Sequence, residues 1–273
     1  MSPPSPSDPP RQLIELDGRP LAYTDEGRGP AILALHGLPG SVRDWRWLAP
    51  VLVAGGARVV RLDMPGFGES AAALAPPQVD DLAAVALRAA GVLGLERPWL
   101  MGHSFGGAFA AAAARQAGDA VSGLLLLASV GLRPHRGFRQ LPAPALMAGL
   151  ARLPGMGALL GAALRAAMVR GGFPRSVTVA DAERCLQILG AFHFEAHREN
   201  IAALRLPTLV AWAADDPLVE AEVGDALALA SPPGPRLRFD EGGHNVQKTH
   251  AEEVGAAVLG VMGLAACAQA ASG

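Results

Sequence analysis

The sequence has few of the residues that indicate a metal centre, a disulfide framework or a nucleic-acid surface. Its two cysteines, Cys185 and Cys267, are far apart and belong to no metal-binding spacing. The 23 basic and 25 acidic residues leave a formal net charge of −2 and form no run of like charge. We therefore expect no metal and no nucleic-acid partner.

The sequence also lacks a long, strongly apolar segment. Residues 1–10 are rich in Ser and Pro and have none of the apolar core of a secretory signal, so we expect a disordered tail over 1–11. Residues 254–271 are largely Ala and include three glycines, whereas a membrane span needs about 20 strongly apolar residues. The sequence thus predicts a C-terminal tail over 265–273, no membrane span and a cytoplasmic protein.

Short apolar runs, by contrast, recur along the whole chain. Six of them have the nearly continuous hydrophobicity, without alternation, of strands that are covered on both faces: 31–35, 58–62, 98–101, 124–130, 208–213 and 236–239. Helical patterns lie between them at 80–92, 105–116, 219–229 and 251–262. This alternation predicts an α/β fold, in which a mostly parallel central sheet is covered by helices on both faces.

One region interrupts the alternation. Between Leu132 and about Asn200 there is no strand pattern, and short helical segments are separated by prolines and by Gly171 and Gly172. We interpret residues 132–203 as a helical cap, inserted after the strand at 124–130 and lying over the carboxyl edge of the sheet. The core then comprises residues 12–131 and 204–264.

The strongest chemical motif is Gly102-His103-Ser104-Phe105-Gly106-Gly107, which has the form G-x-S-x-G. A predicted strand precedes it and an Ala-rich helical pattern follows it, so Ser104 is expected on a sharp strand-to-helix turn. A serine hydroxyl is a weak nucleophile near neutral pH and needs a neighbouring base. We interpret Ser104 as a nucleophile; the alternative is a glycine-rich turn that carries an ordinary serine.

His244 is the best candidate for that base among the seven histidines, because it directly follows the last predicted strand. A loop there lies at the carboxyl edge of the sheet, where a base can approach the serine. The base needs a carboxylate to orient it, and Asp215 and Asp216 follow the strand at 208–213. Residues 124–134 contain neither Asp nor Glu, which removes the main alternative. We favour Asp216, since Pro217 holds it at the end of a turn.

Four ordered motifs make the sequence resemble the α/β-hydrolase superfamily, and in particular its capped, esterase-like members. They are His36-Gly37-Leu38-Pro39-Gly40, Asp63-Met64-Pro65-Gly66-Phe67-Gly68-Glu69-Ser70, the serine motif and the pair Asp216 and His244, and the resemblance covers about residues 12–262. The order Ser, Asp, His is that of the superfamily. Ala213 is a departure, because the family usually has Gly there, and it makes the choice between Asp215 and Asp216 less sharp.

The resemblance implies an oxyanion hole formed by the backbone N–H groups of Leu38 and Phe105. It also argues against an epoxide hydrolase or a haloalkane dehalogenase, since those relatives carry Asp where this chain has Ser104. Binding sites are mostly apolar, and the cap supplies apolar side chains from which we expect a substrate pocket: Met147, Leu150, Phe192 and Phe194. For each of these, packing of the cap onto the core is the competing interpretation.

Together these features predict a serine hydrolase that cleaves carboxylic esters of small to medium apolar substrates through an acyl-enzyme on Ser104, without a cofactor. Three alternatives remain: a carbon–carbon bond hydrolase of ring-cleavage products, a lactonase or acyltransferase, and a slow-turnover ligand-binding receptor. The expected partner is a small-molecule ester. The oligomeric state stays open between a monomer and a homodimer.

Overall fold

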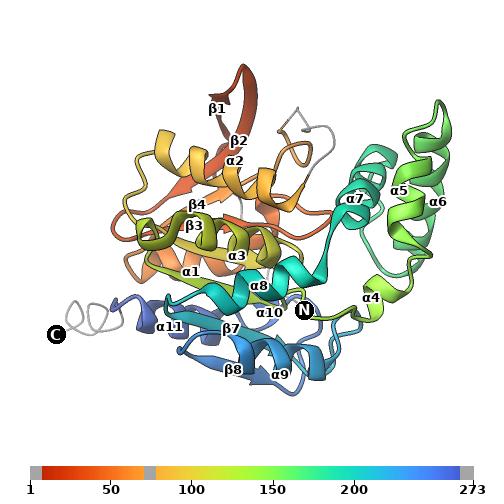
Figure 1. Cartoon of the computed structure of the whole chain (residues 1–273). Helices are drawn as coiled ribbons and strands as arrows, with labels where there is room; N and C mark the ends of the chain where they lie inside the picture. Colours follow the sequence, from red (N-terminus) through yellow and green to blue (C-terminus); the bar gives the residue numbers. More distant parts are fainter. Residues whose placement is uncertain (1–7, 71–77, 265–273) are drawn as a thin grey trace, which may run out of the picture.

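The computed structural model describes residues 8–70 and 78–264, and its centre is an eight-stranded sheet (Figure 1). The strand order is β1-β2-β4-β3-β5-β6-β7-β8. Strands β3 to β8 pair in parallel, whereas β2 pairs antiparallel with both β1 and β4. The bounds are β1 Gln12–Leu16, β2 Arg19–Glu26, β3 Ala31–Leu35, β4 Arg58–Leu62, β5 Trp99–His103, β6 Gly123–Leu127, β7 Thr208–Ala213 and β8 Arg236–Phe239. The predicted fold class is therefore confirmed.

The central strands β3, β5, β6 and β7 are almost entirely apolar because they face two separate cores. In β3, Leu33 and Leu35 point into one core, while Ile32 and Ala34 point into the other. Every residue of β3, β5, β6 and β7 is buried. Successive side chains of a strand alternate between faces, and each fully buried Leu or Ile contributes about 1.5–3 kcal/mol. Burial on both faces accounts for the continuous hydrophobic runs in the sequence.

Helices form one layer on each face of the sheet (Figure 1). One face is covered by α2 (Val79–Val92), α3 (Gly106–Ala117), α8 (Phe194–Ala203) and α9 (Ala221–Ala230). The other is covered by α1 (Leu48–Ala54), α10 (Val246–Thr249), α11 (Ala251–Val261) and the 3-10 helix η1 (Val42–Trp45). A second 3-10 turn, η2, spans Gly118–Ala120. The sheet is thus enclosed, and its functional groups are confined to the loops at the strand ends.

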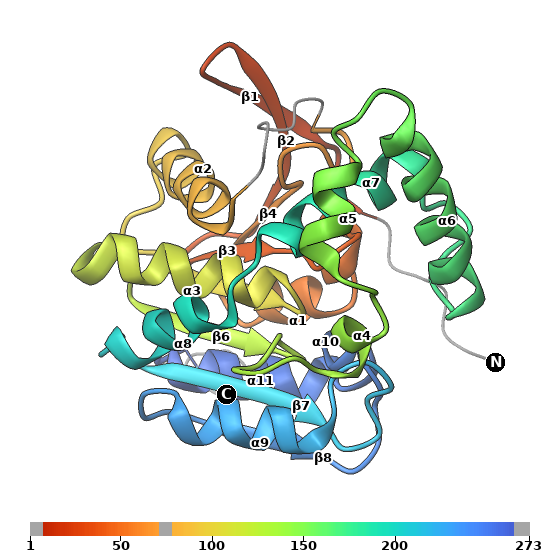
Figure 2. The same cartoon turned by 45° about the vertical axis from the view of Figure 1, so that its right-hand side comes forward.

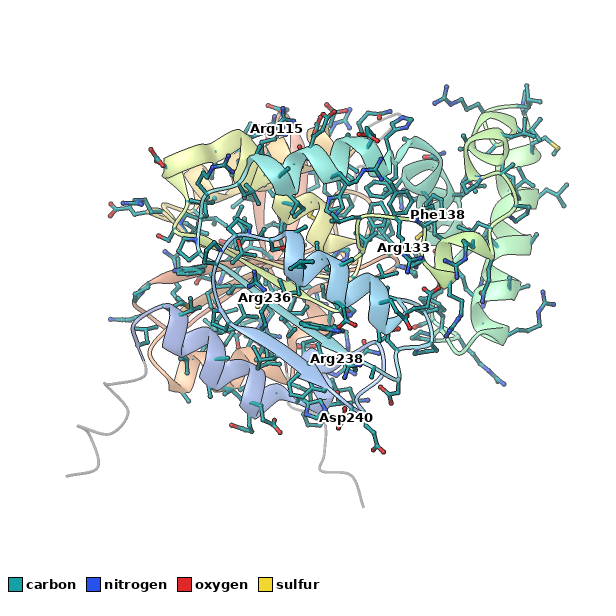
Figure 3. The ribbon with its side chains drawn as sticks, turned by 60° about the horizontal axis from the view of Figure 1, so that its bottom comes forward. Arg115, Arg133, Phe138, Arg236, Arg238 and Asp240 are labelled. Carbon is teal, nitrogen blue, oxygen red and sulfur yellow. The ribbon has the colours of Figure 1, made fainter. Side chains whose placement is uncertain are left out.

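Five helices lie between β6 and β7: α4 (Arg136–Arg139), α5 (Pro144–Leu150), α6 (Met156–Arg170), α7 (Val179–Ala191) and α8. Helices α5, α6 and α7 stand apart from the sheet layers and enclose a small core of their own, formed by Ala151, Leu164, Ala182 and Leu186 (Figure 2). Helix α8 instead packs on α3, where Arg115 donates to Asn200 Oδ1 at 2.9 Å (Figure 3). The range predicted as a cap therefore contains a separate helical layer and a helix of the core.

The predicted elements agree closely with the observed ones. Four of the six predicted strands have the observed bounds, namely 31–35, 58–62, 208–213 and 236–239. The strand predicted over 124–130 ends at Leu127, because Ala128 adopts a left-handed backbone with φ of 43°. The hairpin β1–β2 and helix α1 were not predicted. The hairpin does carry a signal, since Asp17 and Gly18 form its turn with φ of 53° and 71°.

The chain ends differ in what the structure describes. Residues 1–7 of the predicted N-terminal tail and the whole C-terminal tail, 265–273, lie outside the described residues. Asp8 is described, and its carboxylate lies 3.0 Å from the buried guanidinium of Arg61. Within residues 8–70 and 78–264, no helix is long and apolar enough to cross a bilayer.

Candidate active site

Ser104 lies at the turn between β5 and α3, in a backbone conformation that residues other than glycine rarely adopt. Its φ is 53°, in the left-handed region, at a cost of about 1–3 kcal/mol. Three backbone hydrogen bonds hold it there: its N–H donates to the Leu127 carbonyl at 3.0 Å, and its carbonyl accepts from Gly107 and Val130, each at 3.1 Å. The turn thus presents the serine side chain at the end of β5, as the G-x-S-x-G motif predicts.

Glycines surround the serine because the backbone is too tightly packed for side chains. A Cβ at Gly102 would collide with the backbone of Gly106 and Gly107. One at Gly106 would collide with the Leu35 carbonyl, and one at Gly107 with the Ser129 hydroxyl. Contacts this close exclude alanine without movement of the backbone. The three glycines of the motif are therefore required by the geometry of the turn.

The structure brings Ser104, His244 and Asp216 into one hydrogen-bonded chain. His244 Nε2 lies 2.8 Å from Ser104 Oγ, and His244 Nδ1 lies 2.7 Å from Asp216 Oδ2. An ionised carboxylate can only accept a hydrogen bond, so Nδ1 carries the proton and Nε2 is free to accept from the serine hydroxyl. Only 1% of the Asp216 side chain and 13% of the His244 side chain are exposed.

Asp216 is held in its ionised form by its surroundings. Burial alone would raise the pKa of this carboxyl. The hydrogen bond to His244, the charge of that imidazole and the N–H groups of Val219 and Leu218 outweigh burial and hold the pKa below its ordinary value. The two N–H groups donate to Oδ1 at 3.0 and 2.8 Å, which leaves Oδ2 for the histidine. The Asp216 carboxylate therefore keeps a negative charge beside His244 Nδ1.

Asp215, the other carboxylate considered, has a different contact. Its Oδ1 accepts from the backbone N–H of Gly243 at 2.7 Å, one residue before His244. It therefore fastens the loop that carries the histidine and does not contact the imidazole. The structure thus places Asp216 beside the His244 imidazole and Asp215 beside the backbone of Gly243.

The loop that contains Leu38 lies directly beside the serine. A Cβ on Gly37 would come within 3.0 Å of Ser104 Cβ. His36 anchors this loop, since its buried Nε2 accepts from the N–H of Met64 at 2.9 Å. Among the described residues, the backbone N–H groups of Leu38 and Phe105 have no hydrogen-bond partner. Both predicted donors are therefore available to a ligand.

A pair of polar residues, His103 and Asp44, adjoins the chain of Ser104, His244 and Asp216 and was not expected from the sequence. His103 Nε2 lies 2.9 Å from the carbonyl oxygen of His244, and His103 Nδ1 lies 3.5 Å from Asp44 Oδ2. Asp44 Oδ2 also accepts from the Gly37 N–H at 3.3 Å. Burial tends to raise the pKa of Asp44, but the adjacent His103 imidazole lowers it overall. This pair links the His244 loop to the Gly37 loop.

The four side chains predicted to line a pocket divide into two pairs. Phe192 is buried, and its ring lies 4.8 Å from the rings of Phe105 and Phe194; Phe138 is 5.0 Å from Phe194 (Figure 3). Met147 instead packs on the small core of the separate helices. Leu150 is 38% exposed. Of the four, Phe192 thus lies beside Phe105, the neighbour of the serine, and Phe194 lies next to Phe192.

Two further titratable groups are buried, and no contact joins them to the three hydrogen-bonded residues within the described part of the chain. Burial lowers the pKa of His197 to about 4, and burial raises the pKa of the Cys185 thiol. Both are structural groups of the interior. In the described part of the chain, no three His, Cys, Asp or Glu side chains are arranged to hold a metal ion.

Comparison with known proteins assigns the family. The family model for the alpha/beta hydrolase fold matches residues 30–157. A dihydrolipoyllysine-residue acetyltransferase component of the acetoin cleaving system, from Pseudomonas putida, is 31% identical over 263 residues, which are 92% of this chain and 69% of that protein. The chain belongs to the α/β-hydrolase superfamily. For three other curated relatives, the match spans only 16% of the relative's length.

Two more proteins are similar to this chain over most of their length. A 2-hydroxy-6-oxononadienedioate/2-hydroxy-6-oxononatrienedioate hydrolase 2 from Pseudomonas putida is 29% identical, with 88% of this chain and 90% of that one covered. The crystal structure of an alpha/beta hydrolase fold protein from Burkholderia ambifaria superimposes with a TM-score of 0.73 at 26% identity, covering 91% and 97% of the two chains. This α/β hydrolase thus has relatives with different named activities.

Proposed function

We propose that this α/β hydrolase cleaves carboxylic esters with Ser104 as nucleophile, His244 as general base and Asp216 as the residue that orients the base. The observation that carries the proposal is the hydrogen-bonded chain from Ser104 Oγ through His244 to Asp216, at 2.8 and 2.7 Å. The available N–H groups of Leu38 and Phe105 support it, because a nucleophile and an anion-binding pair are both required for acyl transfer.

The first half of the reaction forms an acyl-enzyme. His244 Nε2 takes the Ser104 hydroxyl proton as Oγ attacks the acyl carbon, and the carbonyl electron pair moves onto oxygen. The N–H groups of Leu38 and Phe105 donate to that oxyanion. When the tetrahedral intermediate collapses, the bond to the alcohol oxygen breaks, and this oxygen takes the proton from His244. The imidazolium that forms in between is stabilised by the Asp216 carboxylate.

The second half consumes one water molecule. His244 removes a proton from the water as its oxygen attacks the acyl carbon, and the same two N–H groups again stabilise the oxyanion. Collapse breaks the bond to Ser104 Oγ, which regains its proton from His244, and the carboxylic acid leaves. The enzyme is restored, and no metal or organic cofactor takes part in any step.

We further propose that helices α4–α7 act as the cap, with Phe192, which directly follows α7, and Phe194, the first residue of α8, on the pocket side. These two rings form an apolar cluster with Phe105, so one side of the reaction centre is hydrophobic. Apolar acyl or alcohol groups of small to medium size suit such a surface. Met147 and Leu150 are assigned to the cap's own packing and outer surface.

The proposal is tested with p-nitrophenyl esters from acetate to dodecanoate. We expect turnover of the shorter esters by the wild type and a loss of about 10³-fold or more in Ser104→Ala. Equal hydrolysis by wild type and Ser104→Ala would contradict the assigned nucleophile. An optimum at the longest chains would contradict a compact pocket.

The alternative is hydrolysis of a dienoate ring-cleavage product at the same three residues. It is favoured by the 29% identity, over 88% of this chain, to the 2-hydroxy-6-oxononadienedioate/2-hydroxy-6-oxononatrienedioate hydrolase 2. Parallel assays of the wild type with such a keto-acid and with p-nitrophenyl butyrate distinguish the two functions. A kcat/KM at least tenfold higher for the keto-acid would replace the ester proposal.

A further inference from the structure

The separate helical layer has an unusual charge distribution. Residues 132–180 contain no Asp or Glu and seven arginines: Arg133, Arg136, Arg139, Arg152, Arg165, Arg170 and Arg175. Arg139 is paired with Glu220 of the core, and Arg136 and Arg165 donate to backbone carbonyls. The side chains of Arg133, Arg152, Arg170 and Arg175 are exposed and have no acidic partner among the described residues.

Leucines are exposed on the same layer. Leu146, Leu153 and Leu159 are 63%, 53% and 62% exposed, and Leu150 is 38% exposed. In α6 the buried residues are Gly157, Gly161 and Leu164, which face α7, so Leu159 and Arg170 lie on the side turned away from it. We call Leu146, Leu150, Leu153, Leu159, Arg152 and Arg170 the cap patch. These side chains come from α5, from α6 and from the loop that joins them (the two helices are seen in Figure 2).

We propose that the cap patch docks this enzyme onto an anionic lipid surface. Exposed leucines close in sequence to exposed arginines, such as Leu150, Arg152 and Leu153, are typical of segments that lie in the headgroup region of a membrane, with the leucines inserted and the arginines at the lipid phosphates. Neither α5 nor α6 spans the bilayer in this arrangement. The positive charges of the arginines attract the patch to the anionic headgroups, and insertion of the leucines strengthens the binding.

Two other occupants fit the patch less well. In a symmetric dimer the patch would meet its own copy, which would set unpaired arginines against each other. A protein partner is disfavoured by composition, because binding energy at protein interfaces comes chiefly from Trp, Tyr and Arg, while Leu is under-represented. Residues 141–172 contain no aromatic side chain. A surface of leucines and arginines without aromatic residues therefore fits a lipid surface better than it fits a protein partner.

The test is co-sedimentation of the full chain with phosphatidylglycerol vesicles and with phosphatidylcholine vesicles. At about 0.1 M salt we expect binding to the former only, and loss of binding as salt is raised. Each arginine near an anionic surface is expected to strengthen partitioning about fivefold, so Arg152→Gln/Arg170→Gln is expected to weaken it about 25-fold. Leu146→Gln/Leu159→Gln is also expected to abolish sedimentation.

A matched control carries the same changes elsewhere. Arg28, Arg97 and Leu229 are exposed on the core, so Arg28→Gln/Arg97→Gln/Leu229→Gln is expected to bind as the wild type does. Thermal melting checks that each variant folds. Binding does not depend on the catalytic assignment, and Ser104→Ala is expected to sediment fully.

Three results would overturn the proposal. The first is a wild type that stays in the supernatant with phosphatidylglycerol at low salt. The second is a control variant that loses as much binding as the cap-patch variants. The third is a dimer in light scattering that only the leucine variant dissociates, without vesicle binding, since the patch would then join two copies of the chain.

Discussion

At the scale of single residues, the site depends on which atom of which side chain carries a proton. Asp216 Oδ2 lies 2.7 Å from His244 Nδ1, and its Oδ1 is fully engaged by two backbone N–H groups. This arrangement fixes the imidazole with its proton on Nδ1 and its lone pair toward Ser104. Each of the two neighbouring aspartates can therefore be tested by a change that alters charge but not size.

Asp216→Asn is expected to lower kcat about 10³- to 10⁴-fold, because an amide N–H facing Nδ1 favours the tautomer that cannot accept from Ser104. Steady-state kinetics with a short p-nitrophenyl ester measures the effect. Asp215→Asn is the control: it changes only the hydrogen bond to the Gly243 N–H, and we expect a loss of less than about tenfold. A larger loss for Asp215→Asn than for Asp216→Asn would contradict the assignment.

The pair His103 and Asp44 is expected to position the two loops that meet at the serine. Asp44→Asn removes the charge that His103 and the Gly37 N–H both face. We expect kcat/KM to fall about 10- to 100-fold, mostly in kcat, because small displacements of reacting groups are costly. Asp240, with a side chain 97% exposed, provides the control Asp240→Asn (Figure 3). Unchanged kcat in Asp44→Asn would exclude this positioning function.

At the scale of elements, the sharp turn between β5 and α3 depends on glycines that have no space for a side chain. Gly102→Ala is expected to lower the free energy of unfolding by about 1–3 kcal/mol, because its Cβ meets the backbone of Gly106 and Gly107. Urea unfolding measures the loss. Gly149→Ala in α5 is the control, since nothing lies within 4 Å of its added Cβ. That change is expected to be neutral or stabilising, and an equally small effect at Gly102 would contradict the tight packing.

Helix α8 makes stability depend on pH through His197, which is buried against the core. Burial lowers its pKa from 6.5 to about 4, so between these pH values the unfolded chain binds more protons than the folded one. The free energy of unfolding therefore falls as the pH is lowered through this window, by up to about 3 kcal/mol.

His197→Gln is expected to remove that part of the pH dependence, as measured by urea unfolding at pH values of about 7 and 4.5. His193→Gln is the control, because His193 is exposed, and it should retain the dependence of the wild type. If His197→Gln loses stability on acidification as steeply as the wild type does, His197 is not the titrating group.

The elements also differ in how far they could be predicted from the sequence. Strand β3 is apolar throughout and β7 is apolar after Thr208, because both their faces are covered, whereas β4 combines three apolar residues with Arg58 and Arg61. The bounds of all three strands were predicted. Strand β1 lies at the edge of the sheet and is largely exposed, so it has no such pattern. The hairpin of β1 and β2 could have been predicted only from its Asp17-Gly18 turn. In the cap, an apolar residue does not reveal its neighbours, and Met147 and Phe192 therefore looked alike in the sequence.

At the scale of the whole molecule, the site is assembled from residues far apart in the chain. Ser104 follows β5, Asp216 follows β7 and His244 follows β8, so three carboxyl ends of parallel strands meet at one edge of the sheet. The order of motifs along the sequence predicted this meeting. The link from His103 to Asp44 was not predictable, since it depends on the packing of η1 beside β5.

The most direct test of the proposed function is covalent labelling by a fluorophosphonate, followed by mass spectrometry of the intact protein and its peptides. An activated serine displaces fluoride and gains one phosphonyl group. We predict a single adduct on the peptide that contains Ser104, none in Ser104→Ala, and much slower labelling in His244→Ala. Unlabelled wild type, or an adduct that persists in Ser104→Ala, would contradict a nucleophilic Ser104.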